Sequence, residues 1–108
     1  MPEINFMVKG SAEEPYEVTF LKNGDNLLVF CSCPAGDNRR HCKHRVAIMN
    51  GSSSNIVSDN REEIATVQAW MQGTDVETAL RELNDAENEG DAKRLAAAKS
   101  KLARAMND

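Results

Sequence analysis

The chain has 108 residues, three cysteines, two histidines and a formal net charge of −4. Its length fits one domain with a modest core, because such a chain buries roughly two thirds of the surface that its unfolded form exposes. The acidic balance argues against a protein that coats nucleic acid, and no stretch approaches the roughly 18 apolar residues of a membrane span. Because the N-terminus also lacks the features of a signal peptide, we expect a cytoplasmic protein without membrane contacts.

Three short segments rich in β-branched and aromatic residues predict strands at residues 4–8, 16–22 and 27–31. In the second segment, Tyr16, Val18 and Phe20 alternate with less apolar positions, which indicates a strand with one buried face. Asn23-Gly24 follows as a strong hairpin signal. The second and third strands should therefore pair antiparallel.

All three cysteines and both histidines fall between Cys31 and His44, in CSCPAGDNRRHCKH. On an extended strand Cys31 and Cys33 point the same way about 6.5 to 7 Å apart, so both sulfurs can reach one ion. Cys42 and His44 can converge on that ion where the chain enters the helix predicted from HRVAIM. Three thiolates and one imidazole form the closed tetrahedral set typical of structural zinc. We therefore predict one structural Zn²⁺ bound by Cys31, Cys33, Cys42 and His44.

Other readings of this segment stay open. His41 could replace His44 as a ligand, because it is adjacent to Cys42. The cysteines could also be ordinary buried residues without a metal, or Cys31 and Cys33 could form a reactive thiol pair, although neither reading explains the paired spacing with a histidine. An odd number of cysteines in a reducing compartment favours metal binding over disulfides.

Beyond Asn50-Gly51, which should end the HRVAIM helix, residues 51–58 form a polar linker and the chain becomes helical from residue 59. Two residue pairs fit the capping box that begins a helix: Asp59 with Glu62, and Thr74 with Glu77. Gly90 followed by Asp91 should end one helix and begin the next. The apolar residues that recur at helical spacing are Ile64, Val67, Trp70, Met71, Val76, Leu80, Leu83, Leu95, Ala98, Leu102 and Met106. About three C-terminal helices are expected.

The last two predicted helices carry opposite charge: residues 75–89 hold six acids and one base, and residues 91–106 hold five bases and one acid. Antiparallel pairing would bring these charges together. The charged side chains can simply lie on the solvated faces of two amphipathic helices. Alternatively, the two helices can form a self-complementary hairpin through which the chain oligomerises.

The fold class predicted from these elements is α+β. A small antiparallel sheet with a ββα zinc finger occupies residues 1–50. A polar linker follows at residues 51–58, and a helical segment occupies residues 59–108. We expect the three parts to form one compact domain.

The pattern C-x-C, eight residues, C-x-H, after a hairpin and before a helix, resembles the SWIM zinc finger over about residues 16–50. Cys33-Pro34 and Cys42-Lys43-His44, followed by Val46 and Ala47, match that family's usual residues. The resemblance implies a zinc-bound strand-strand-helix unit that binds DNA or proteins.

Two functions follow as expectations. The first is a non-enzymatic regulatory or adaptor protein that binds a protein partner, which the acidic chain favours. The alternative is a DNA- or RNA-binding finger that uses the basic residues beside the metal, namely Arg39, Arg40, Lys43 and Arg45. We do not expect an enzyme, because the sequence has no H-E-x-x-H, phosphate-binding glycine loop or Ser/His/Asp arrangement.

Overall fold

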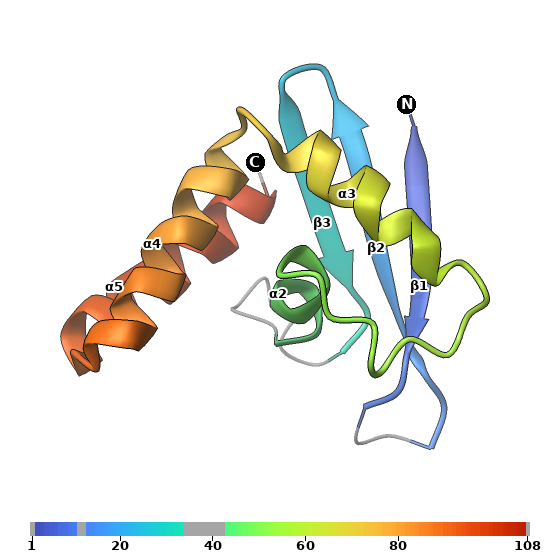
Figure 1. Ribbon diagram of the computed structural model, residues 1–108, viewed down its shortest axis with the longest axis horizontal. Helices are drawn as coiled ribbons and strands as arrows, with labels where there is room; N and C mark the ends of the chain where they lie inside the picture. The colour runs from blue at the N-terminus through green and yellow to red at the C-terminus, as the bar shows by residue number, and fades with distance from the viewer. Residues whose placement is uncertain (1, 11–12, 34–42, 108) are drawn as a thin grey trace.

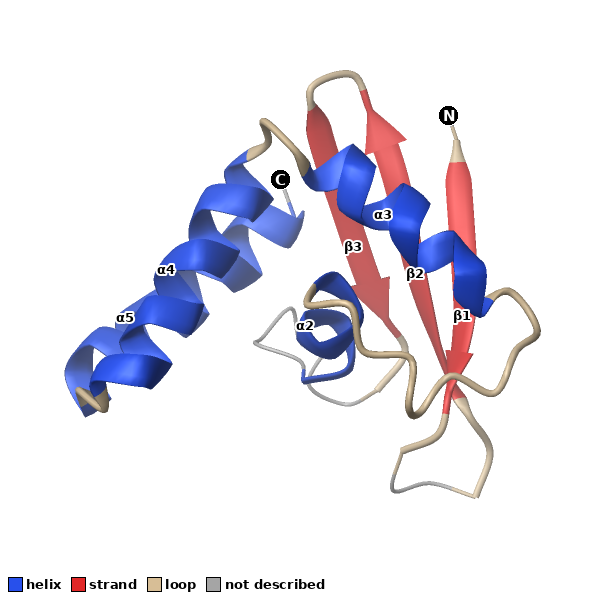
Figure 2. Ribbon diagram, in the orientation of Figure 1, coloured by secondary structure: helices blue, strands red, loops and turns tan. Residues whose placement is uncertain are grey.

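The computed structural model describes residues 2–10, 13–33 and 43–107 (Figures 1 and 2). Three strands form an antiparallel sheet in the order β1-β2-β3: β1 (Glu3–Val8), β2 (Tyr16–Asn23) and β3 (Asn26–Cys31). They are followed by α2 (Lys43–Met49), a 3₁₀ turn η1 (Arg61–Glu63), α3 (Ile64–Met71), α4 (Asp75–Glu89) and α5 (Ala92–Asn107). This order confirms the α+β class, with the finger helix α2 preceding three C-terminal α-helices.

Strand alternation buries one face of the sheet. Phe20 of β2 pairs with Ile4 of β1 and Val29 of β3, and its ring meets Phe6 edge to face with centroids 5.8 Å apart. The buried inner face consists of Ile4, Phe6, Val8, Val18, Phe20, Leu27, Val29 and Cys31. Helices α2 and α3 cover this face (Figure 1).

The predicted hairpin forms where Asn23 pairs with Asn26. Gly24 lies between them with φ 59°, a left-handed conformation that glycine adopts at low cost. The antiparallel pairing of β2 and β3 is confirmed.

The outer edge of β1 is covered by the segment that the sequence predicts as a polar linker. Lys9 N donates to Asn55 O and Val57 N donates to Met7 O, both at 2.8 Å. Between these contacts Ile56 is buried and bridges Val8. This part of the linker therefore pairs with the sheet and fills the core, because a strand edge left unpaired would leave its backbone groups unsatisfied.

The predicted capping box at Asp59 and Glu62 is wrong. The residue before η1 is Asn60, and its side chain caps no backbone amide. Its amide group donates instead to Asn5 O at 2.7 Å and to Glu63 Oε2 at 2.8 Å. The side chain is thus used to hold the loop against β1.

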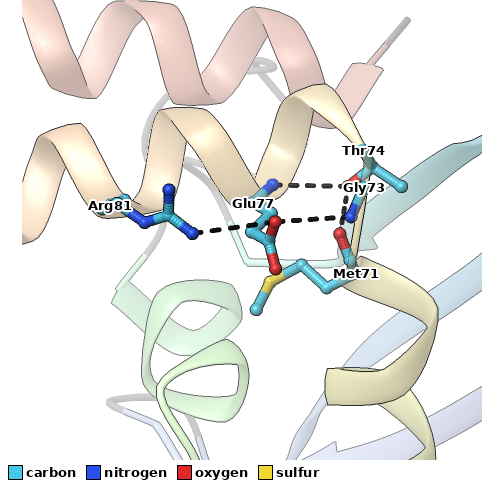
Figure 3. A network of polar contacts seen from close by, with 5 residues as sticks. All are labelled: Met71, Gly73, Thr74, Glu77 and Arg81. Carbon is cyan, nitrogen blue, oxygen red and sulfur yellow. Dashed lines mark hydrogen bonds and ion pairs between the residues drawn. The ribbon is translucent and has the colours of Figure 1, made fainter.

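The predicted boundary at Thr74 is confirmed (Figure 3). Thr74 Oγ1 accepts a hydrogen bond from Glu77 N at 3.3 Å and donates to Met71 O at 2.6 Å. The Glu77 carboxylate accepts from Gly73 N at 3.3 Å and lies 3.8 Å from Arg81 Nη2. These contacts satisfy amide groups that the first turn of α4 would leave without partners.

Helices α4 and α5 form the expected antiparallel hairpin and lie side by side (Figure 1). Gly90 ends α4 with φ 74°, and Asp91 Oδ1 accepts from the backbone amides of Lys93 and Arg94. The buried side chains of the hairpin are Val76, Ala79, Leu80, Leu83, Ala86, Ala98, Leu102, Ala103 and Met106. No helix in the described part of the chain is long and apolar enough to cross a membrane.

Two ion pairs link the oppositely charged helices. Lys101 Nζ lies 2.9 Å from Glu82 Oε2, and Arg94 pairs with Glu89 across the connection. The hydrogen bond from Arg94 to Glu89 raises the pKa of the guanidinium above its ordinary value. These pairs satisfy charges within one chain, and oligomerisation through this hairpin stays a prediction.

Candidate metal centre

Three of the four predicted metal ligands meet where β3 ends and α2 begins. Cys31 is the last residue of β3, Cys33 follows two residues later, and His44 is the second residue of α2. All three side chains are buried, and the exposed Ser32 separates the two cysteines. Ser32 N donates to Glu17 O at 3.0 Å, and Glu17 N donates to Ser32 Oγ at 2.9 Å. Strand β2 thus holds the Cys-Ser-Cys segment extended, with both sulfurs on the inner side.

The donor atoms lie close to the spacing that zinc requires, and one pair lies at that spacing. The two sulfurs and one imidazole nitrogen all lie within 4.8 Å of one another, and Cys31 Sγ is 3.8 Å from His44 Nδ1. In a tetrahedral site, Zn–S bonds of about 2.3 Å and Zn–N bonds of about 2.0 to 2.1 Å place neighbouring ligand atoms about 3.5 to 3.8 Å apart. Soft sulfur and imidazole donors select zinc over calcium or magnesium. The residues present therefore fit a zinc ion.

The wall beside His44 includes two residues that the sequence analysis did not assign to the site. The Tyr16 ring lies 5.2 Å from the His44 ring, centroid to centroid, at an angle of 45°. A Cβ added at Gly10 would lie 2.4 Å from Tyr16 Cε2 and 3.1 Å from His44 Nε2. A side chain at Gly10 would displace the Tyr16 ring that packs on His44. In the sequence, the one sign of this close approach was a glycine just after the first predicted strand.

Arg45 occupies a different place from the one predicted. Its side chain is 0% exposed, and Nη1 donates to Val29 O at 2.9 Å. It is therefore not available as a surface contact for nucleic acid or a partner, which corrects that prediction. The reason is that α2 packs on β3, so that His44 and Arg45 both extend towards the strand. Lys43, which precedes them, is exposed as expected.

The remaining predicted site residues lie outside the described residues: Arg39, Arg40, His41 and Cys42. The fourth zinc ligand and the alternative histidine ligand therefore stay predictions. Among the described residues, Cys31, Cys33 and His44 form the one group of three or more histidine, cysteine or carboxylate side chains that could hold a metal ion.

Comparison with curated proteins gave no match, and neither did comparison with solved structures. A family model does match: the SWIM zinc finger, over residues 16–50, about a third of the chain. The match begins at the first residue of β2, includes the three converging donors, and ends just after α2. The resemblance noted from the cysteine and histidine spacing is confirmed: the segment from β2 to α2 matches the SWIM zinc finger and contains a Cys/Cys/His group that could bind zinc.

Proposed function

We propose that this chain is a non-enzymatic adaptor in which one structural zinc holds β3 and α2 together and the resulting rigid surface binds a protein partner. The observation that carries the proposal is the outer face of the sheet, opposite α2 and α3 (Figure 2). Phe30 lies on this face, is 42% exposed and pairs with Thr19. Leu21 and Leu28 pair beside it and are both partly exposed. An exposed aromatic residue beside two leucines suits a protein partner.

The charges on this outer face support a protein partner over a nucleic acid. Its described residues are Glu3, Asn5, Met7, Glu17, Thr19, Leu21, Asn23, Asn26, Leu28, Phe30 and Ser32. They include two acids and no base. Nucleic-acid binding needs clustered bases that neutralise phosphates. A sheet surface with apolar and acidic side chains would instead repel a phosphate backbone.

The donor set supports a structural role for the zinc. With Cys42 as the expected fourth ligand, all four tetrahedral positions would be taken by protein atoms, and none would be left for a water molecule or substrate. The ion would then supply a cross-link between a strand end and a seven-residue helix. Because the cysteine and histidine side chains would all be used for that cross-link, we assign none of them a catalytic role.

A capture experiment tests the adaptor. The zinc-loaded chain is immobilised and exposed to host lysate with and without nuclease treatment, in parallel with Phe30→Ser and with Val57→Ser as a matched control. Val57 is 52% exposed but follows Ile56 at the edge of β1. We expect nuclease-resistant partners to bind wild type and Val57→Ser and to be lost with Phe30→Ser. Capture that disappears after nuclease treatment, or that Phe30→Ser leaves intact, contradicts the proposal.

The alternative, a nucleic-acid-binding finger, is favoured by one observation: Lys9 and Lys43 line the same hollow beside His44. Burial of Arg45 leaves Arg39, Arg40 and Lys43 as the bases of the predicted set that could contact phosphates. Three contacts predict a slope of about −2.7 in log K against log salt on duplex DNA.

A titration of labelled duplex and single strands at about 0.15 M salt separates the two functions. We expect no detectable binding, because the chain carries −4 and a zinc with three thiolates adds a further −1. Submicromolar binding that Arg39→Ala with Arg40→Ala abolishes would make nucleic acid the ligand.

A further inference from the structure

We infer that Arg45 positions α2 for metal binding and supplies the buried positive charge that the thiolate site needs. Among the described residues Arg45 has the largest side chain that is fully buried. Its neighbours in α2 that face the core are Val46, Ile48 and Met49. An apolar side chain at this position would fill the same space without the cost of removing a charge from water. Packing alone therefore does not account for an arginine here.

The first part of this role is geometric. Two consecutive residues of α2 reach β3: His44 Nδ1 lies 3.8 Å from Cys31 Sγ, and Arg45 Nη1 donates to Val29 O at 2.9 Å. Val29 and Cys31 are two residues apart on the strand, so the two contacts are made to strand positions about 7 Å apart. A single contact would let α2 rotate about it, whereas two separated contacts define the rotation. Arg45 thereby sets the direction in which the His44 imidazole points.

The local stability of α2 makes this second contact necessary. The helix has seven residues, fewer than the roughly 12 to 15 at which isolated helices become stable in water. Its orientation must therefore come from contacts with the rest of the chain. The charged hydrogen bond to Val29 O is 2.9 Å long, buried and directed by a planar guanidinium, which makes it well suited to hold one geometry.

The second part of the role is electrostatic. With Cys42 as the expected third thiolate, a zinc ion and a neutral imidazole would give the site a net charge of −1, and the described ligands Cys31, Cys33 and His44 are buried. A buried negative charge is costly unless a positive charge lies nearby. The cationic Arg45 guanidinium is hydrogen-bonded to Val29 O, two residues before Cys31 on the strand. It supplies that opposite charge from inside the protein.

The test measures zinc affinity of the full chain by competition with a chromogenic chelator. Arg45→Met removes the charge and the hydrogen bond and keeps much of the volume, and Arg45→Lys keeps the charge. One control is Arg61→Met, because Arg61 also donates to a backbone carbonyl, Ile56 O, at 2.7 and 3.0 Å. The other is Leu83→Ala, which destabilises the buried interior of α4 without contacting the metal site.

We expect Arg45→Met to weaken zinc binding about 10- to 100-fold, the range seen when residues that orient metal ligands are removed. Arg45→Lys should weaken it less, by about 2- to 10-fold, because it restores the charge but not the planar donor. The two controls should change it by less than about 2-fold, because they lie away from the site. The visible spectrum of the Co²⁺-loaded protein should shift in Arg45→Met and stay unchanged in the controls.

Equal zinc affinities for Arg45→Met and Leu83→Ala would overturn the inference, since loss of stability alone would then explain the result. If Arg45→Met does not fold, Arg45→Lys decides, and an unchanged zinc affinity in that variant overturns the inference as well. The role of Arg45 rests on the zinc binding proposed for this chain. If the wild-type chain takes up no zinc, both the zinc site and the role of Arg45 are wrong. If the wild type takes up zinc normally and the Arg45 variants bind it equally well, only the role of Arg45 is wrong.

Discussion

Replacing Cys33 by serine changes a single buried atom and removes one soft donor from the metal centre. A serine hydroxyl is not a ligand of structural zinc sites, so we expect the zinc content of the purified chain to fall from about one ion per chain to near zero. The site joins the end of β3 to the start of α2. The structural consequence should therefore appear in α2 first, ahead of the sheet and the helical hairpin.

The magnitude follows from what holds α2 in place. Ordering the backbone of its seven residues costs about 7 to 14 kcal/mol. Burial of Val46, Ile48 and Met49 contributes about 4.5 to 9 kcal/mol, and the Arg45 hydrogen bond about 1.5 to 3 kcal/mol. These terms balance within a few kcal/mol, so the ion decides whether α2 stays docked. At a zinc concentration of 100 Kd the ion adds about 2.7 kcal/mol, or about a hundredfold in the docked population.

Amide hydrogen exchange measures this effect residue by residue. Protection of the α2 amides and of Asn50 N, which follows α2 and bonds to Val46 O at 3.0 Å, should fall about a hundredfold in Cys33→Ser. Amides in α4 should keep their protection. Phe30→Ser is the matched control, because Phe30 directly precedes Cys31 but is exposed on the outer face of the sheet, and this variant should keep both zinc and protection. Unchanged α2 protection after zinc loss, or an equal loss in α4, would refute the reasoning.

Three further predictions concern stability, measured by urea denaturation. Thr74→Ala should lower the free energy of unfolding by about 1 kcal/mol through loss of the α4 cap, and an unchanged midpoint would show that the cap contributes nothing. Phe20→Ala should lower it by about 3 to 5 kcal/mol, because the ring is fully buried against Phe6, and a loss below about 1 kcal/mol would contradict that packing. Glu82→Gln should cost less than about 1 kcal/mol, because its pair with Lys101 is half-exposed, and a larger loss would mean that charge pairing holds the hairpin together.

Local rules were enough to predict most of the elements. The alternation around Val18 and Phe20, the turn at Gly24 and the cap at Thr74 each depend on a few neighbouring residues, and the structure has all of them. The same holds for Cys31 and Cys33, because residues two apart on a strand lie on one face. The capping box at Asp59 failed because the helical turn begins one residue later, after Asn60, whose side-chain amide bonds to Asn5, a residue distant in sequence.

By itself, the sequence determined the kinds of donor atom, their spacing and the elements that carry them, because these depend on chain geometry over a few residues. Only the tertiary structure decided that Ile56 of the linker enters the core and that Arg45 is buried and hydrogen-bonded to Val29 O. An arginine in a basic run is predicted to face water, since its charge is best solvated there. Its burial depends on a carbonyl of β3 and on the packing of α2, and neither can be read from residues 39–45.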